Sequence, residues 1–264
     1  MMIHNIPVFY INLDDNIERN KNIIENINKV GFTNYEKISA VDTRTIEKVN
    51  KYKNMIDSNS YKDLLENNKS HKRKYHEDLT NGSIGCFLSH LKIYQKIVDN
   101  NIPMAIILED DCVFNLDKEK FWNQINKINM PQDTDMIILS GIFKKFSKIN
   151  ENVGKFKRFY LLHFYVVTNS GAKKLLENLK IIQYQIDSQI SILNLQKKIN
   201  LYAYNDISLA HSDSKFGTNI QNLSCYGCSE RDLDNLDNLY NINYIIIIII
   251  FIFVTFILYY CKIL

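Results

Sequence analysis

The sequence predicts a single α/β domain, with a mainly parallel sheet flanked by helices, followed by a transmembrane helix at the C-terminus. Two observations predict the domain: short apolar runs alternate with stretches of helical periodicity, and one continuous apolar run stops at three acidic residues. A third observation, the apolar run that closes the printed sequence, predicts the membrane helix. We therefore expect a folded domain over residues 1–222, a polar linker over 223–243 and a membrane segment over 244–264.

The composition is that of an ordinary globular protein and argues against nucleic acid as a partner. With 264 residues and 46% hydrophobic content, the chain can bury one sizeable core. Its 32 basic and 29 acidic residues leave a formal net charge of only +3. A protein that binds nucleic acid by neutralising phosphates needs a larger basic excess. We therefore expect no nucleic-acid partner.

The cysteines do not suggest a disulfide framework. There are five of them, an odd number spread along the chain: Cys86, Cys112, Cys225, Cys228 and Cys261. Cys225 and Cys228 form a C-x-x-C pair, but no second pair or nearby pair of histidines completes a zinc set. We expect ordinary thiols, which fit a reducing compartment.

The N-terminal elements are expected in this order: a strand over residues 8–13, a helix over 15–30 ended by Gly31, and a strand over 35–39. Residues 45–80 are polar and lack a convincing strand, so we expect helices and loops on the surface. A basic cluster at 71–74 lies in this part, and a solvated face explains it better than a phosphate site.

A helix over residues 83–100 is predicted by its apolar stripe. Apolar side chains recur there at helical spacing, namely Ile84, Phe87, Leu88, Leu91, Tyr94 and Val98. At about 100° per residue, Ser89 and His90 lie off this stripe and share another face with Cys86. We therefore expect Ser89 and His90 not to be ordinary core residues.

A buried strand over residues 104–108 follows. Its continuous apolar run is typical of a strand covered on both faces, and it stops at Glu109, Asp110 and Asp111. Further elements are expected as a strand over 136–139, a strand over 164–168 and a helix over 172–179.

The acidic triplet is the part of the sequence that carries chemistry. Three neighbouring carboxylates repel one another, and the adjacent apolar residues raise the cost of ionising them. A bound Mg²⁺ or Mn²⁺ removes this difficulty, because hard cations prefer carboxylate oxygens and keep positions open for phosphates. The triplet is also expected at the carboxyl edge of a parallel sheet, where open α/β folds bind ligands. A solvated acidic turn would explain the triplet alone equally simply.

The wider pattern resembles glycosyltransferase family 25, which includes bacterial lipooligosaccharide galactosyltransferases and procollagen galactosyltransferases. The resemblance covers roughly residues 7–220 and rests on motifs in the family's order and approximate spacing. These motifs are VFYINL at 8–13 with Arg19, AVD at 40–42, GSIGCFLSH at 82–90, LEDD at 108–111, YVV at 165–167, GAKKLL at 171–176 and ID at 186–187. The combination of G-x-x-G-C-x-x-S-H with E-D-D is more specific than any single short motif.

The resemblance implies a GT-A type fold and a metal-dependent, inverting transfer of a hexose, galactose, from a UDP-sugar. The acceptor would be a hydroxyl group on a glycan, glycolipid or protein. The residues implied around the nucleotide and donor are Asn12, Arg19, Asp42, Ser89, His90 and Glu109. Asp110 and Asp111 would hold Mn²⁺ or Mg²⁺, with Asp111 as the direct ligand, and a cation there would neutralise the leaving UDP.

Two further residues are candidates from their own context. Inversion requires a general base for the acceptor hydroxyl, and Asp187 is a lone acid in an apolar and amide-rich stretch. A helix N-cap is an equally good explanation of Asp187. His211 is a candidate late metal ligand, and an exposed loop histidine is the alternative.

The sequence departs from the family in two places, and other functions stay open. Thr43 stands where the family has glycine after Ala-Val-Asp, and a single catalytic domain is expected, so collagen is not implied as acceptor. The alternatives are a membrane-tethered nucleotide-sugar-binding or scaffold protein without turnover, and a metal-dependent phosphohydrolase that uses the same carboxylates.

The apolar run over residues 244–261 is expected to span a membrane. Its roughly eighteen residues nearly cross the hydrocarbon core as a helix, tyrosines lie at both ends, and Lys262 follows. Because the N-terminus has no charged lead or apolar signal region, we expect a single-pass tail anchor with the catalytic domain in the cytosol. The rival topology is lumenal, and glycans at the sequons of Asn81 or Asn222 would report it.

Overall fold

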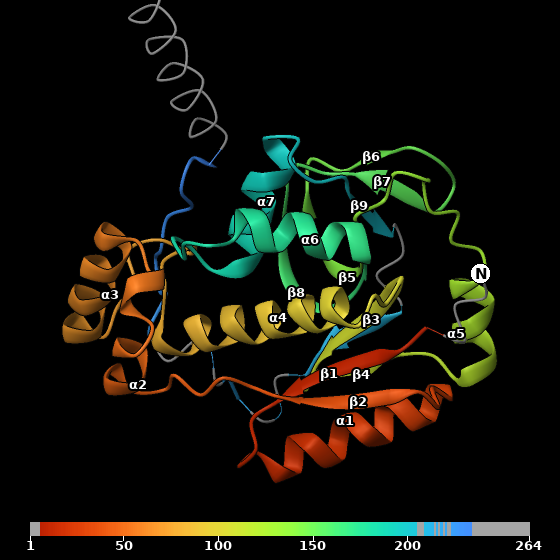
Figure 1. Cartoon of the computed structure of the whole chain (residues 1–264), viewed down its shortest axis with the longest axis horizontal. Helices are drawn as coiled ribbons and strands as arrows, with labels where there is room; N and C mark the ends of the chain where they lie inside the picture. The colour runs from red at the N-terminus through yellow and green to blue at the C-terminus, as the bar shows by residue number, and fades with distance from the viewer. Residues whose placement is uncertain are drawn as a thin grey trace, which may run out of the picture. The chain divides into compact units, whose positions relative to one another are not determined.

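The computed structural model describes residues 6–204, 209–213, 215, 217–218, 220 and 223–233 (Figure 1). The chain divides into a compact unit that ends at Glu230 and a second unit that starts at Arg231. The helices of the first unit are α1 Ile17–Val30, α2 Ile46–Asn50, η2 Lys53–Met55, α3 Ser58–Ser70, α4 Asn81–Asp99, α5 Lys118–Ile125, α6 Asn169–Asn178 and α7 Ile186–Leu195. Its strands are β1 Val8–Asn12, β2 Tyr35–Ser39, β3 Met104–Glu109, β4 Cys112–Phe114, β5 Met136–Lys144, β6 Ser147–Lys148, β7 Val153–Lys155, β8 Arg158–Thr168, β9 Leu201–Tyr204 and β10 Ala210–Ser212.

The main sheet is mixed, so the prediction of a mainly parallel sheet is wrong. Its eight strands run in the order β2-β1-β3-β8-β5-β9-β7-β6. The pairs β1–β2, β1–β3 and β5–β9 are parallel, whereas β8 is antiparallel to both β3 and β5. The pairs β7–β9 and β6–β7 are antiparallel as well. A long strand inserted in the opposite direction at the centre therefore divides the sheet.

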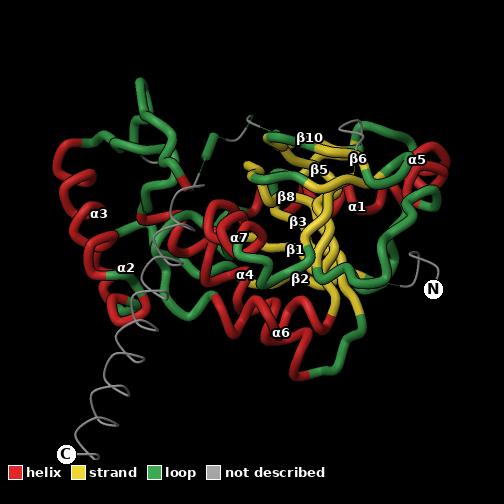
Figure 2. Tube along the Cα trace, turned by 90° about the horizontal axis from the view of Figure 1, so that it is seen from above, coloured by secondary structure: helices red, strands yellow, loops and turns green. Residues whose placement is uncertain are grey.

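Helices cover both faces of the main sheet, as expected from the continuous apolar runs of its strands. In β1, Phe9 and Ile11 face one core, whereas Val8 and Tyr10 face the other, as the alternation of side chains along a strand requires. Helices α4, α6 and α7 pack on the first face, and α1 and α5 pack on the second. Figure 2 shows α4 and α6 on one side of the strands and α1 and α5 on the other. The expected flanking helices are therefore confirmed.

Helix α4 crosses the first face and carries more buried polar groups than its apolar stripe predicts. Thr80 caps it in a reciprocal pair with Ser83, which satisfies two backbone N–H groups of the first turn. Ser89 and His90 are both fully buried. The expectation that they lie outside the core is therefore wrong, because the residue 40–43 loop covers Ser89 and Tyr165 of β8 covers His90.

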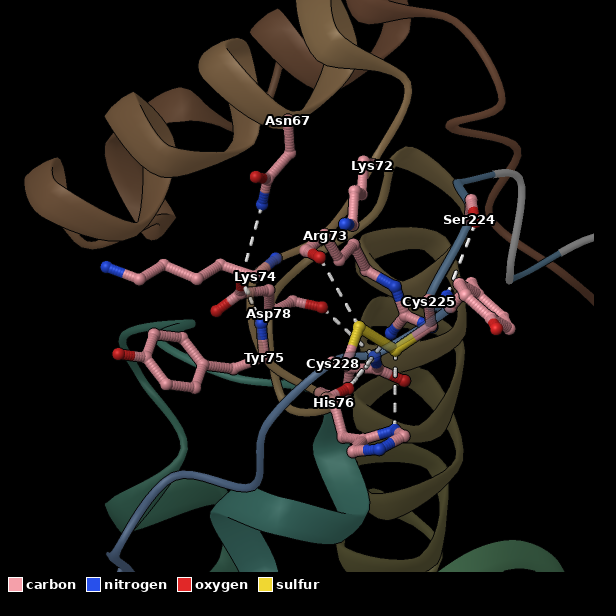
Figure 3. Close-up of a disulfide and its surroundings, with 12 residues drawn as sticks. Asn67, Lys72, Arg73, Lys74, Tyr75, His76, Asp78, Ser224, Cys225 and Cys228 are labelled. Atoms are coloured by element: carbon pink, nitrogen blue, oxygen red, sulfur yellow. Dashed lines mark hydrogen bonds between the residues drawn. A yellow bond between two sulfur atoms is a disulfide. The ribbon is translucent and has the colours of Figure 1, made fainter.

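Cys225 and Cys228 form a disulfide, so the expectation of two ordinary thiols is also wrong (Figure 3). The turn between them places Gly227 at φ +72° and brings the two Cα atoms to 5.1 Å, a spacing that a disulfide accepts. Cys225 Sγ lies 3.3 Å from Nδ1 of His76. The neighbouring Arg73 of the basic cluster is buried and donates to the carbonyl of His76, so this cluster is not a uniformly solvated face. The disulfide removes the argument for a reducing compartment.

The predicted C-terminal membrane helix is not supported. Within the residues that the structure describes, no helix has both the length and the apolar character needed to cross a membrane. Residues 244–264, on which the prediction fell, lie outside the described residues. The prediction of a single-pass anchor is therefore not supported. Membrane association and the cytosolic placement of the domain depended on that anchor, so these two predictions are not supported either.

The backbone at the start of α6 lies very close to the backbone that precedes β5, and this contact offers a test of the architecture. A Cβ atom on Gly171 would lie 2.1 Å from the carbonyl oxygen of Asp135, which precedes β5. We expect Gly171→Ala to lower the free energy of unfolding by roughly 1–3 kcal/mol, because backbone must move to admit the methyl group. Thermal unfolding followed by circular dichroism measures the loss. Lys173→Ala, at an exposed position of the same helix, is the control and should change stability little; equal effects of the two variants would contradict the close contact.

Candidate active site

The candidate site lies at the carboxyl ends of three parallel strands. Strands β2, β1 and β3 are neighbours and run in the same direction, so Asn12, the residue 40–44 loop and the acidic triplet meet at one edge. This is the edge at which open α/β sheets bind ligands. The sequence predicted this meeting, and the structure brings together Asn12, Arg19, Asp42 and the triplet around one cavity.

Two cavities adjoin at the acidic triplet. The smaller has a volume of about 80 Å³ and is bordered by β1, the residue 40–44 loop and the first turns of α4. The larger, of about 310 Å³, is bordered by β8, the start of α7 and residues 212–213. They share five lining residues: Cys86, Glu109, Asp111, Thr218 and Ile220. The carboxylates of Glu109 and Asp111 therefore face both cavities.

Asp110 is held by two partners from the N-terminal elements. Its Oδ1 lies 2.8 Å from Nη1 of Arg19, and its Oδ2 accepts a hydrogen bond of 2.8 Å from Asn12. Burial nevertheless raises the pKa of Asp110, and the charge of Arg19 offsets only part of that cost. Both carboxylate oxygens of Asp110 are thus engaged by protein partners in this structure.

Asp111 has a free carboxylate oxygen. Its Oδ2 accepts a hydrogen bond of 2.7 Å from Ser212 and lies 3.6 Å from Nη2 of Arg19. Its Oδ1 is buried and meets no hydrogen-bond partner within the described part of the chain. Burial, followed by repulsion from Glu109, raises the pKa of Asp111 to about 7. An unpaired oxygen on an acid that ionises with difficulty is the arrangement that a cation would relieve.

Glu109 is oriented by a chain of buried side chains from α4 and β8. Its Oε1 lies 3.1 Å from Nε2 of His90, whose Nδ1 lies 2.8 Å from the hydroxyl of Tyr165. Burial opposes ionisation, yet the hydrogen bond with His90 keeps the pKa of Glu109 below its usual value. His90 lines neither cavity. The structure thus places His90 behind Glu109, away from the lining of both cavities.

Cys86 joins His90 and Glu109 in a group with metal-ligand spacing. Within the described ranges, their ligand atoms lie within 4.8 Å of one another. A sulfur, nitrogen and oxygen set suits Zn²⁺ better than Mn²⁺. Both ring nitrogens of His90 are already engaged, Nδ1 by the hydroxyl of Tyr165 and Nε2 by Glu109. We therefore do not assign a metal to this group.

Ser89 positions the loop over the smaller cavity. Its Oγ accepts a hydrogen bond of 2.8 Å from the backbone N–H of Val41 and donates to the carbonyl of Gly85. A Cβ atom on Gly85 would lie 2.2 Å from the carbonyl oxygen of Val41, so only glycine fits. Thr43, at the position where the sequence departs from the family, is buried and donates to the carbonyl of Asn81. The loop is therefore fastened to α4 at several points.

Asp42 is engaged by basic neighbours at the edge of the smaller cavity. It accepts hydrogen bonds from the backbone and guanidinium of Arg44 and from Lys48. These bonds hold the pKa of Asp42 well below its usual range. Arg44 also lines the smaller cavity, which adds a second cation there beside Arg19.

Asp187 lines the larger cavity from the first turn of α7. Gln185 occupies the N-cap position of this helix, so Asp187 is not the N-cap that was its alternative explanation. Its Oδ1 accepts from the backbone of Ser188 at 2.7 Å, and its Oδ2 accepts from the N–H of Leu161 at 3.4 Å. Burial raises the pKa of Asp187 to about 6.

His211 is exposed on β10, with Nδ1 2.6 Å from Oδ1 of Asn115, and it lines neither cavity. The structure therefore does not bring His211 to the acidic triplet. Its neighbour Ser212 contacts Asp111 instead.

The comparisons with known proteins agree with the motifs. The sequence profile described as "Glycosyltransferase family 25 (LPS biosynthesis protein)" matches residues 5–190, more than half of the chain. The chain belongs to glycosyltransferase family 25. The family membership expected from the motifs is confirmed.

Curated family 25 relatives are similar to the chain over a shorter stretch. Procollagen galactosyltransferase 1 of Danio rerio is 31% identical over 111 residues, which are 39% of this chain and 18% of that protein. Procollagen galactosyltransferase 2 of Homo sapiens is 29% identical over 108 residues, 37% of this chain and 17% of that protein. A "Glycosyltransferase 25 family member" of Aedes aegypti is 30% identical over 109 residues, 40% of this chain and 16% of that protein. The match thus covers less than a fifth of each relative.

Three features of this site were not predicted from the sequence. Arg44 stands two residues after the AVD motif, and a basic side chain so close to that motif could have been recognised as a candidate. Thr218 and Ile220 lie in a polar stretch without periodicity. His163 sits inside a strand, where the sequence carries no sign that it lines the larger cavity.

The raised pKa of Asp111 predicts a pH dependence of stability in the metal-free protein. The folded state binds the proton up to about pH 7, whereas an unfolded aspartate releases it near its usual value. The free energy of unfolding therefore contains a contribution that falls as pH rises from about 4 to about 7. Asp111→Asn should remove this contribution, at about 1.4 kcal/mol for each unit by which the pKa is raised.

Chemical denaturation in EDTA at pH 4.5 and 8 measures this contribution. Compared with the wild type, Asp111→Asn should gain stability at the higher pH. Asp99→Asn, at an exposed position, is the control and should follow the wild type. A wild type and Asp111→Asn with parallel pH profiles would contradict the assignment.

Proposed function

We propose that this chain is a metal-dependent, inverting glycosyltransferase that moves galactose from a UDP-sugar to a hydroxyl group. The acceptor would be carried by a glycan, glycolipid or protein. One observation carries the proposal: Glu109 and Asp111 lie at the junction of two cavities and line both. Galactose is proposed because the relatives are named galactosyltransferases.

The smaller cavity suits the diphosphate of the donor. Arg19 and Arg44 line it, paired with Asp110 and Asp42, and Gly82 in the first turn of α4 also lines it. The N-terminus of a helix favours anions, because its backbone N–H groups and dipole point outward. Asn12 and the loop at Asp42 border the remaining wall. This arrangement supports a nucleotide with its phosphates directed toward the triplet.

The acidic triplet fits a divalent cation. Asp111 offers an unpaired buried oxygen, and Glu109 lies beside it, so these two residues would hold Mn²⁺ or Mg²⁺. When bound, such an ion neutralises the negative charge that develops on the departing diphosphate. Asp110 orients the site through Arg19 and Asn12.

Asp187 is placed to act on the acceptor side. It faces the larger cavity, and a pKa of about 6 leaves it ionised at neutral pH while keeping it a useful base. The N–H of Leu161 and the backbone of Ser188 orient its two oxygens. A carboxylate so held would take the proton of an acceptor hydroxyl as that oxygen attacks the sugar, on the face opposite the departing UDP.

The metal assignment predicts the outcome of a UDP-sugar screen. The wild type should release UDP from UDP-galactose only when Mn²⁺ or Mg²⁺ is present. Asp111→Asn should abolish this release, because a neutral amide is a poor ligand for a hard cation. Asp99→Asn is the matched control and should keep the wild-type rate. Full activity of Asp111→Asn, or of the wild type in excess EDTA, would contradict the assignment.

The assignment of Asp187 predicts a loss confined to the chemical step. Asp187→Asn should lower transfer to an acceptor by roughly 10²- to 10⁴-fold and leave the affinity for UDP-galactose nearly unchanged. Steady-state kinetics together with calorimetric donor titration measures both quantities. Asp213 is a second acid of the larger cavity. If Asp213→Asn shows this loss in place of Asp187→Asn, the base is Asp213. Weaker donor binding by Asp187→Asn would indicate a structural role for Asp187.

A further inference from the structure

The larger cavity is bordered by an irregular stretch of β8. Ser140 and Ile142 of β5, two positions apart, pair with Phe164 and Tyr160 of β8, four positions apart. Strand β8 therefore bulges between these pairs, and bulges commonly redirect side chains next to active sites. Leu161 in the bulge has φ +75°, a left-handed conformation that leucine rarely adopts. A strained backbone conformation persists only where the surrounding structure holds it, so the packing around the bulge fixes this stretch of β8.

The bulge directs His163 toward the larger cavity. The side chain is buried, with 2% of its surface exposed, and it lines this cavity together with Leu161. Its Nδ1 is buried and has no hydrogen-bond partner among the residues that the structure describes. A buried polar atom without a partner costs free energy, so an unpaired atom beside a cavity points to a ligand group that pairs with it.

The hydrogen bonds around His163 determine which nitrogen carries the proton. The hydroxyl of Ser140 donates to the carbonyl oxygen of Ala210 at 2.7 Å. Because that hydrogen is used, Ser140 Oγ accepts at 2.9 Å from Nε2 of His163. Nδ1 is therefore the unprotonated nitrogen and offers a lone pair. Burial lowers the pKa of His163 to about 4, so the ring stays neutral at pH 7.

We propose that Nδ1 of His163 accepts a hydrogen bond from a sugar hydroxyl bound in the larger cavity and so positions that sugar. The proposal rests on the proposed function, because it requires a saccharide in this cavity. The hydroxyl comes from either the transferred hexose or the acceptor, and the two sources are separated by experiment. His163 is a binding and specificity residue in this assignment, and Asp187, which lines the same cavity, is the proposed base.

The test compares the binding of three probes by calorimetry in Mn²⁺: UDP, UDP-galactose and methyl β-galactoside. His163→Phe keeps a ring but has no acceptor atom, and it should leave the affinity for UDP unchanged. If the hydroxyl belongs to the hexose, the affinity for UDP-galactose should fall about 10-fold; if it belongs to the acceptor, that for methyl β-galactoside should fall instead. His163→Gln retains an acceptor oxygen and should restore part of the loss. Tyr160→Phe, which removes a buried unpaired hydroxyl from the same strand outside the cavity lining, is the control.

The outcomes separate this inference from the proposed function. Unchanged affinity of His163→Phe for both saccharide probes, with UDP binding intact, would overturn the role of His163. Failure of the wild type to bind either saccharide probe would overturn it as well. If saccharide binding depends on His163 but no sugar is transferred under any condition, the proposed transferase activity fails and the assignment of His163 stands.

Discussion

The confinement of three consecutive carboxylates at the end of a buried strand is the constraint on which this site depends. Glu109 ends a strand that is covered on both faces, and Asp110 and Asp111 follow it, so none of the three is fully solvated. Each is held by a different partner: His90 for Glu109, Arg19 for Asp110 and Ser212 for Asp111. These partners come from α4, α1 and β10. Elements far apart in the sequence are thus joined through one turn.

The two halves of the main sheet supply different parts of the site. The parallel group β2-β1-β3 brings its carboxyl ends together and forms the smaller cavity beside Asn12 and the residue 40–44 loop. The antiparallel strand β8 follows, and its bulge forms a wall of the larger cavity. Because β3 pairs with both β1 and β8, the acidic turn lies where these halves meet. A change of strand direction therefore coincides with the junction of the cavities.

Sequence patterns were sufficient to predict where the buried strands lie in the chain but not whether neighbouring strands run parallel or antiparallel. The apolar runs of β1 and β3 predicted their positions closely, because a strand covered on both faces has few polar residues. The same runs carry no information on whether a neighbour is parallel, so the strand over 164–168 was predicted but the antiparallel direction of β8 was missed. The strands β7 and β9 are three and four residues long, too short for a periodic signal. The Cys225–Cys228 disulfide depends on a turn at Gly227 that spacing alone did not indicate.

A residue that lines both cavities cannot be substituted without changing the shape of both. Cys86 borders both, so a larger side chain there would narrow the two compartments together. Leu161 and Gln185 border only the larger one. Evolutionary drift at these outer positions can reshape one compartment without disturbing the other, whereas drift at Cys86 is constrained from both sides. Under the proposed function, in which the acceptor occupies the larger cavity, new acceptor preferences would arise first along β8 and at the start of α7.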